Sequence, residues 1–228
     1  MRTVDEGMHA AALRVQPWTI SNHKSPGTYY DFREHPELIR TNLEEFCPYG
    51  SFGGVESFYS LIEWLNGSGS PFETNDARLT EHMIVNRQRN LADKEFASLA
   101  EFCFFFRDLR LNLAEDSPRW SILWDSHQID ENEFPIQPNG TCHKYIYDLI
   151  RIVERSSGKT WPQIIGIGTA PIYYEDAPVL PREKYGTEFV IRAWLWGNTE
   201  EEVFDGLGNV ASVLRPAIVK AYSKNIVR

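Results

Sequence analysis

The chain has 228 residues, of which 42% are hydrophobic and 24% are charged, a composition that excludes an intrinsically disordered protein. The formal net charge of −9 disfavours nucleic acids and anionic membranes as ligands, because proteins bind both through Lys and Arg. No apolar run is long enough to cross a bilayer. We therefore expect a soluble protein without nucleic-acid or membrane partners, whose acidic surface is compatible with basic partners or serves solubility alone.

The cysteines and the opening residues indicate a compartment. Cys47, Cys103 and Cys142 are odd in number and show no CxxC spacing, and the first residues do not resemble a secretory signal. These features predict free thiols in a reducing cytoplasm. Cys103 lies in the apolar run EFCFFF and is predicted to be buried.

The first part of the chain is predicted to hold one strand and two helices. Residues 1–30 are expected to form an irregular arm with a strand in LRVQPWTI, and residues 31–228 a single domain. A helix is expected to begin at Pro36, which suits a first helical turn, and to end before Pro48. The segment GGVESFYSLIEWLNG predicts a second helix, because its apolar residues recur at helical spacing before an Asn-Gly stop.

The next two segments are predicted to be a loop and a buried helix. Residues 68–82, SGSPFETNDARLTEH, have the composition of a loop. Residues 92–116 show the strongest helical pattern in the chain, since Asp93 suits the N-cap and apolar residues from Phe96 to Leu113 recur on one helical face. We expect this segment to be the central buried helix.

Strands and helices are predicted to alternate in the second half of the chain. RWSILW is expected to be a short strand, and TCHKYIYDLIRIVERSSG a helix that ends at Gly158. PQIIGIGTAPIYY and TEFVIRAWLWG are β-branched and aromatic segments that predict two strands with a Pro- and Gly-rich connector. The last helix opens with a capping box of Thr199 and Glu202, and Pro216 is expected to kink or end it.

The order of these elements predicts the fold class. The two clearest strands are neighbours in the sequence, which favours antiparallel pairing over a doubly wound parallel sheet. The sequence therefore predicts a helix-rich single α+β domain with a small, mainly antiparallel sheet. It does not indicate an oligomeric state.

Familiar catalytic and cofactor motifs are missing from the sequence. The tripeptide GKT at 158–160 resembles the end of a phosphate-binding loop, but Val153 stands where that loop needs glycine. The segment GIGTA lacks the third glycine of a dinucleotide-binding loop. Cys142, in the first turn of a helix, is placed for a lowered thiol pKa, yet the adjacent His143 does not face it. We therefore assign no catalytic residue, metal or cofactor.

The polar segment 68–82 is the first candidate for a functional patch, which we expect to bind a partner or ligand through Glu73, Asn75, Asp76 and Arg78. Glu73 and Asp76 could serve as an acid and a base, while Arg78 orients an anion. The structural alternative is that Asn75 and Asp76 form a turn and Arg78 makes a local salt bridge.

A second polar cluster follows RWSILW. Asp125 and His127 are two residues apart, so an extended chain could present both on one face. With Glu73 or His82 they could form an oxygen and nitrogen metal site. The spacing itself supplies only two ligands, and the alternative is a solvated acidic loop.

The strand TEFVIRAWLWG and the helix after it provide a further candidate surface. Arg192, Trp194 and Trp196 alternate along the strand and therefore share one face. If that face is covered, the tryptophans belong to the core, and if it is open they form the aromatic and Arg surface that binding hot spots favour. Glu201 and Asp205 are predicted to add an acidic rim beside it.

Two functions fit these patterns. The first is a non-enzymatic acidic binding or inhibitory module that covers a basic protein partner, such as a bacterial or phage immunity protein that blocks a nuclease toxin. The second is a small metal-assisted hydrolase that uses Glu73, Asp76, Asp125 and His127. The charge, the size and the missing catalytic motifs favour the first.

Overall fold

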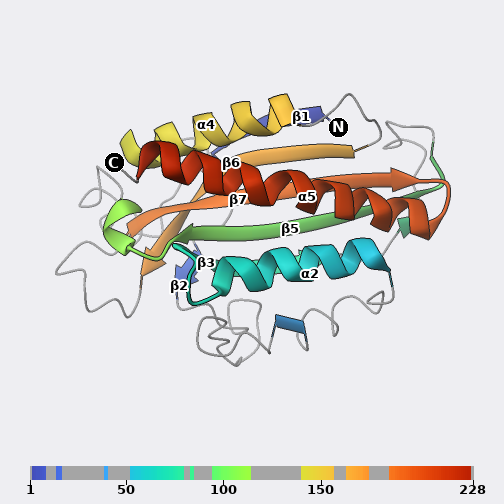
Figure 1. Ribbon diagram of the computed structural model, residues 1–228, viewed down its shortest axis with the longest axis horizontal. Coiled ribbons are helices and arrows are strands. Elements are labelled where there is room, and N and C mark those ends of the chain that lie inside the picture. The colour runs from blue at the N-terminus through green and yellow to red at the C-terminus, as the bar shows by residue number, and fades with distance from the viewer. Residues whose placement is uncertain are drawn as a thin grey trace, which may run out of the picture.

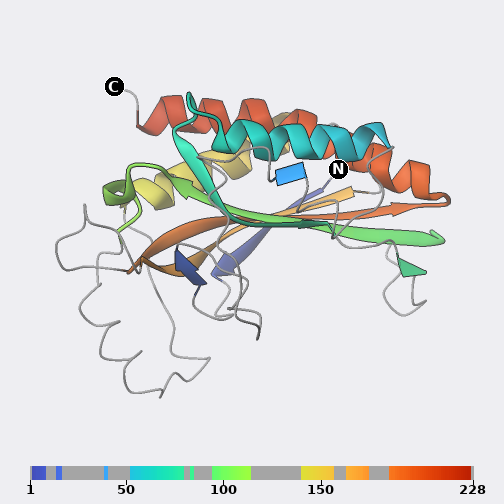
Figure 2. The same ribbon diagram turned by 90° about the horizontal axis from the view of Figure 1, so that it is seen from below.

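A computed structural model shows one sheet with helices on one of its faces (Figure 1). Seen edge-on, α2, α4 and α5 all lie on the same side of the sheet (Figure 2). The structure describes residues 2–8, 14–16, 39–40, 52–79, 83–84, 94–113, 140–156, 163–174 and 185–226. The predicted strand RWSILW and most of the predicted helix from Pro36 lie outside these residues, and only Ile39 and Arg40 of that helix are described, as helical.

The sheet is mainly antiparallel. Its strands are β1 (Arg2–Met8), β2 (Arg14–Gln16), β3 (Phe72–Leu79), β4 (Met83–Ile84), β5 (Phe96–Phe106), β6 (Gln163–Tyr174) and β7 (Tyr185–Gly197). The order across the sheet is β1-β6-β7-β5-β3, with β2 also paired to β6 and β4 to β5. The contacts of β6 with β7, β7 with β5 and β5 with β3 and β4 are antiparallel, whereas β1 and β2 run parallel to β6. The predicted α+β fold is confirmed, while the division into an arm and one domain stays a prediction.

Three long helices follow the predicted segments closely. They are α2 (Gly53–Asn66), α4 (Gly140–Ser156) and α5 (Glu200–Asn225), and a short 3-10 helix, η3, covers Leu109–Leu111. α5 lies between α2 and α4 and packs against both (Figure 1). Because each helix has an apolar stripe, the three together bury the near face of the sheet.

An aromatic cluster fills the space between the helices and the sheet. Phe104 and Phe106 of β5 and Phe189 of β7 meet Tyr145 of α4, whose ring centroid is 4.6 Å from that of Phe189 and 5.0 Å from that of Phe106. Phe72 of β3 joins them, with its centroid 5.5 Å from that of Phe104. Offset and edge-to-face rings at such distances add to the free energy gained by burying them.

The predicted central helix over residues 92–116 is wrong, because Phe96–Phe106, within that segment, form the strand β5. The run from Phe102 to Phe106 is buried on both faces of the sheet, and β5 pairs with β7 on one side and with β3 and β4 on the other. A strand covered on both faces reads as a continuous apolar run, which contains helical spacings as well as alternation. The aromatic content of this run favoured a strand.

The predicted loop over residues 68–82 is also wrong, because Phe72–Leu79 forms strand β3. β3 lies at the end of the strand order, and its pairing with β5 is shifted between Thr74 and Asp76. Edge strands commonly carry polar residues and bulges, which keep them from pairing with other chains. A polar composition therefore did not distinguish an edge strand from a loop.

The predicted start of α5 is confirmed. The Thr199 hydroxyl accepts a hydrogen bond from the backbone N–H of Glu202 at 3.2 Å, and the Glu202 carboxylate accepts one from the N–H of Asn198 at 2.8 Å. The helix does not end at Pro216 but continues to Asn225. Because proline has no N–H, the carbonyl of Ser212, four residues earlier, lacks its helical donor. Pro216 and Ser212 are both exposed, so water can bind this carbonyl instead.

The buried hydroxyl of Tyr145 leads to a stability prediction. It has no hydrogen-bond partner in the part of the chain that the structure describes, and burial, with a smaller contribution from Cys142, raises the pKa of Tyr145 well above its usual value. Removing this hydroxyl in Tyr145→Phe is expected to stabilise the fold by about 1 kcal/mol at pH 7, since burying it without a partner is costly.

The same variant should lose less stability in alkali. Above about pH 10, the usual pKa of tyrosine, Tyr145 ionises in the unfolded chain, whereas its raised pKa keeps it protonated in the folded one. The wild type therefore loses stability as the pH rises above this value, and Tyr145→Phe does not lose that part. Urea unfolding of the wild type and Tyr145→Phe at pH 7 and pH 10.5 measures both effects. Tyr147→Phe is the control, because Tyr147 is 56% exposed. Lower stability of Tyr145→Phe at pH 7 would contradict the prediction.

Candidate functional site

The start of α5 carries an exposed group of carboxylates. Glu201, Glu202 and Asp205 are exposed, and Glu200 is half-buried in the same first turn. Negative side chains at this position interact favourably with the N-terminal end of the helix dipole, so the helix itself tolerates their mutual repulsion. These residues come directly after the last strand of the sheet, at one end of the molecule (Figure 1).

Three carboxylates near this end make no hydrogen bond or ion pair with the residues that the structure describes: Glu95, Glu201 and Asp205. Each of the other carboxylates whose side chains the structure describes has at least one interaction, such as those of Glu56 and Glu63 with Arg40. Phe96 pairs with Gly197, which brings Glu95 beside the start of α5. The Nζ atom of Lys94 lies 4.0 Å from the Oε2 atom of Glu202, also beside the start of α5. We call Glu95, Glu201 and Asp205 the acidic end.

Sequence analysis selected Glu201 and Asp205 but not Glu95. Glu95 lies more than a hundred residues away from them in the chain, and only the pairing of β5 with β7 brings it close. The segment around it was predicted to be helical, so no pattern in the sequence pointed to this neighbourhood.

The three predicted strand residues share one face, as expected. Arg192, Trp194 and Trp196 point away from the helices, because the alternate residues Ala193 and Leu195 belong to the core beneath the helices. Trp196 is only 6% exposed, and the Arg192 guanidinium bonds the carboxylate of buried Glu101. These contacts give Arg192 a structural role, while its part in binding a partner stays a prediction.

The polar residues of β3 are spread along a strand and do not converge in a loop. Glu73 is buried, and the register places Asp76 opposite Cys103 and Arg78 opposite Glu101. Asn75 falls where the pairing shifts. A role in binding for Glu73, Asn75, Asp76 and Arg78 stays a prediction.

The alternative metal site is not tested by the structure. His82, Asp125 and His127 lie outside the described residues. Among the side chains that are described, no group of three or more His, Cys, Asp or Glu residues is arranged to hold a metal ion. The hydrolase hypothesis therefore stays a prediction from the sequence.

Cys142 is a structural thiol. It is buried, its sulfur donates a hydrogen bond to the carbonyl oxygen of Leu111 at 3.2 Å, and burial raises its pKa to about 12. The raised pKa runs opposite to the lowering that a helix N-terminus favours, because burial removes the water that would stabilise a thiolate. Cys103 is buried as predicted.

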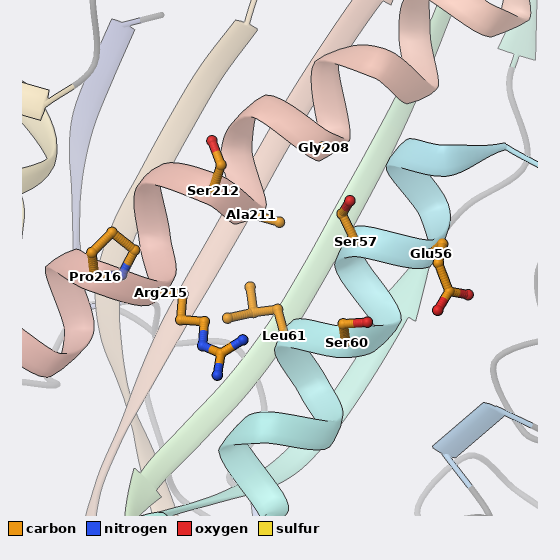
Figure 3. A pocket seen from close by; sticks show the side chains of 9 residues that line it. All are labelled: Glu56, Ser57, Ser60, Leu61, Gly208, Ala211, Ser212, Arg215 and Pro216. Carbon is orange, nitrogen blue, oxygen red and sulfur yellow. The ribbon is translucent and has the colours of Figure 1, made fainter.

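A groove of about 310 Å³ lies between α2 and α5. Its walls are mainly small or hydroxyl-bearing side chains, and Figure 3 shows Leu61 and Ala211 between the two helices and Arg215 reaching from α5 towards α2. The lining residues are Glu56, Ser57, Ser60, Leu61, Gly208, Ala211, Ser212, Arg215 and Pro216. Sequence analysis did not select this surface, because α2 and α5 are separated by more than a hundred residues in the chain.

Comparison with known proteins assigns no family. No protein-family model, no curated protein and no solved structure matches this chain. None of the described helices is both long enough and apolar enough to cross a membrane. The function is therefore argued from the geometry alone.

Proposed function

We propose that the protein is a non-enzymatic binding module that covers a basic protein partner with its acidic end. The observation that carries this proposal is the gathering of Glu95, Glu201 and Asp205 at one end of the molecule, where none of the three makes a hydrogen bond or ion pair within the described part of the chain. Carboxylates that no described Lys or Arg bonds are available to the cations of a partner.

Electrostatic complementarity gives this surface its effect. Like charges at the acidic end repel one another, and Lys or Arg side chains of a partner relieve that repulsion on binding. The net charge of −9 extends the same attraction over a longer range and steers a basic partner towards the protein. Such steering raises the association rate and fades as salt is added.

The form of this function that we favour is inhibition, in which the module blocks a basic toxin or nuclease in the cytoplasm, as an immunity protein does. The acidic charge suits the basic surface that a nuclease needs for its substrate. The sequence also lacks familiar catalytic motifs.

Affinity capture from a lysate of the source cells, at low and at high salt, is the first test. We expect the tagged full-length protein to retain a basic protein in a fixed ratio at low salt and to release it at high salt. Mass spectrometry of the intact complexes identifies the retained protein and gives the number of its copies bound to each tagged chain. If no basic protein is retained at low salt, the proposal is wrong.

The acidic end itself is tested by neutralising it. Glu201→Gln with Asp205→Asn is expected to slow association with the captured partner by about 10-fold at low salt, with a smaller effect at high salt. The control variant, Ser156→Lys with Ser223→Lys, makes the same change in net charge at exposed sites on α4 and the end of α5. Surface plasmon resonance measures both rates. Equal slowing in the two variants would show that only net charge matters and that the acidic end is not the contact surface.

A further inference from the structure

Arg215 of α5 is a cation without an acidic partner. Its guanidinium carbon lies 5.2 Å from the ring centroid of Trp64, and it makes no hydrogen bond or ion pair in the part of the chain that the structure describes. Arg40, on the same helical layer, instead bonds Glu56 and Glu63. Stacking on an aromatic ring orients the guanidinium and leaves its N–H groups to donate to another acceptor.

The cation of the groove, Arg215, has no carboxylate bonded to it among the residues that the structure describes. Glu56 is the one carboxylate among the lining residues, and Arg40 bonds both of its oxygens, at 2.6 and 2.8 Å. Because Arg40 also bonds Glu63, Arg215 is the cation that is left to bind an anion in the groove. Ser60 also lines the groove, and its hydroxyl can donate to a bound anion, whereas the hydroxyls of Ser57 and Ser212 donate to the carbonyl oxygens of Gly53 and Asn209.

We propose that this groove receives one Asp or Glu side chain of a protein partner, whose carboxylate Arg215 binds. The proposal rests on the proposed function for the origin of that side chain. It concerns a different surface from the acidic end, since the groove lies along α2 and α5 and the acidic end lies where α5 begins (Figure 1). A basic partner also carries carboxylates, and one of them placed here would fix its orientation on the helices.

Charge and shape favour a carboxylate from a protein. One Arg balances the single charge of a carboxylate, whereas a dianionic phosphate would leave a second negative charge unbalanced on a chain whose net charge is already −9. Pockets for small molecules enclose most of the ligand. This groove runs between two helices, has both polar and apolar lining residues and is open to solvent, so it suits a single side chain of a larger partner (Figure 3).

NMR titration of the full chain, labelled with ¹⁵N, tests the site without a partner. The probe is N-acetyl-glutamate N-methylamide, added at constant ionic strength and followed at the Nε–Hε signals of the arginines. N-acetyl-glutamine N-methylamide is the neutral control, and inorganic phosphate tests the other oxyanion. Arg151 is the control within the protein, because its guanidinium carbon lies 5.4 Å from the ring centroid of exposed Tyr147 on α4 and it does not line the groove.

We expect the glutamate probe to shift the Arg215 signal with saturation, and the Arg151 signal only in a weak, linear way. Arg215→Gln should weaken binding of the probe by at least about 10-fold, and Arg151→Gln should leave it unchanged. Equal shifts at both arginines, equal binding of the glutamine probe or tighter binding of phosphate would each overturn the proposal. Because no partner is present, this result is independent of whether the lysate contains a basic protein.

Discussion

Gly54→Ala is expected to destabilise the fold by about 3 kcal/mol. Gly54 lies in the first turn of α2, where the helix touches the backbone of α5, and a Cβ added there would lie 1.6 Å from the carbonyl oxygen of Phe204. No side-chain rotation can relieve that overlap, because the neighbour is backbone, so the two helices must move apart. Their separation would also disturb the contact between the tilted rings of Phe52 and Phe204, whose centroids are 5.0 Å apart.

The preceding glycine supplies a control for this prediction. A Cβ added at Gly53 would meet nothing within 4 Å, so Gly53→Ala is expected to stabilise the fold by about 0.5 kcal/mol through the lower entropy of the unfolded chain. Urea unfolding of both variants, with the same slope against denaturant, gives the two free energies of unfolding. Equal stabilities for the two variants would show that α2 and α5 can separate at little cost.

The contact at Gly54 also explains the groove. The Cα of Gly54 would lie 3.2 Å from a Cβ at Gly208, so the two helices approach most closely through a pair of glycines. Further along, Ser57, Ser60 and Ala211 are too small to fill the space between helices of this separation. The close contact and the hollow next to it therefore have one cause, the small residues on the facing sides of α2 and α5.

The fold could be predicted from the sequence where an element has a polar face or clear boundaries. α4 and α5 show apolar stripes on otherwise polar helices, and β6 and β7 are bounded by a clear connector, so these elements were assigned correctly. β5 was not, because both of its faces are buried and no polar face marks its period. β3 failed for the opposite reason, since a polar edge strand has the composition of a loop.

The candidate site could be predicted only in part, because it depends on contacts between distant segments. Glu201 and Asp205 are neighbours on one helix and could be selected by their spacing. Glu95 joins them through the pairing of β5 with β7, and Arg215 faces Ser57 and Ser60 through the packing of two distant helices. The absence of an acidic partner for Arg215 is likewise a property of the folded chain.

Arg192→Met is expected to destabilise the fold by about 3 kcal/mol, because it removes a cation that bonds the buried carboxylate of Glu101. The Glu101 side chain is 1% exposed, whereas the Arg192 side chain is 20% exposed. Water can therefore solvate the guanidinium in part when the pair is broken, but it cannot reach the carboxylate. Arg192→Met combined with Glu101→Met should recover most of the loss, since an apolar pair of similar volume removes the buried charge.

The same pair of variants decides between two roles for Arg192. Equilibrium unfolding in urea of the wild type, both single variants and the double variant gives the coupling energy between the two side chains. A large coupling shows that Arg192 serves chiefly to neutralise Glu101 on the face of the sheet away from the helices. A stable Arg192→Met variant would contradict this and make Arg192, together with Trp194, available for binding a partner. Because Arg192 bonds a buried carboxylate, we expect the large coupling.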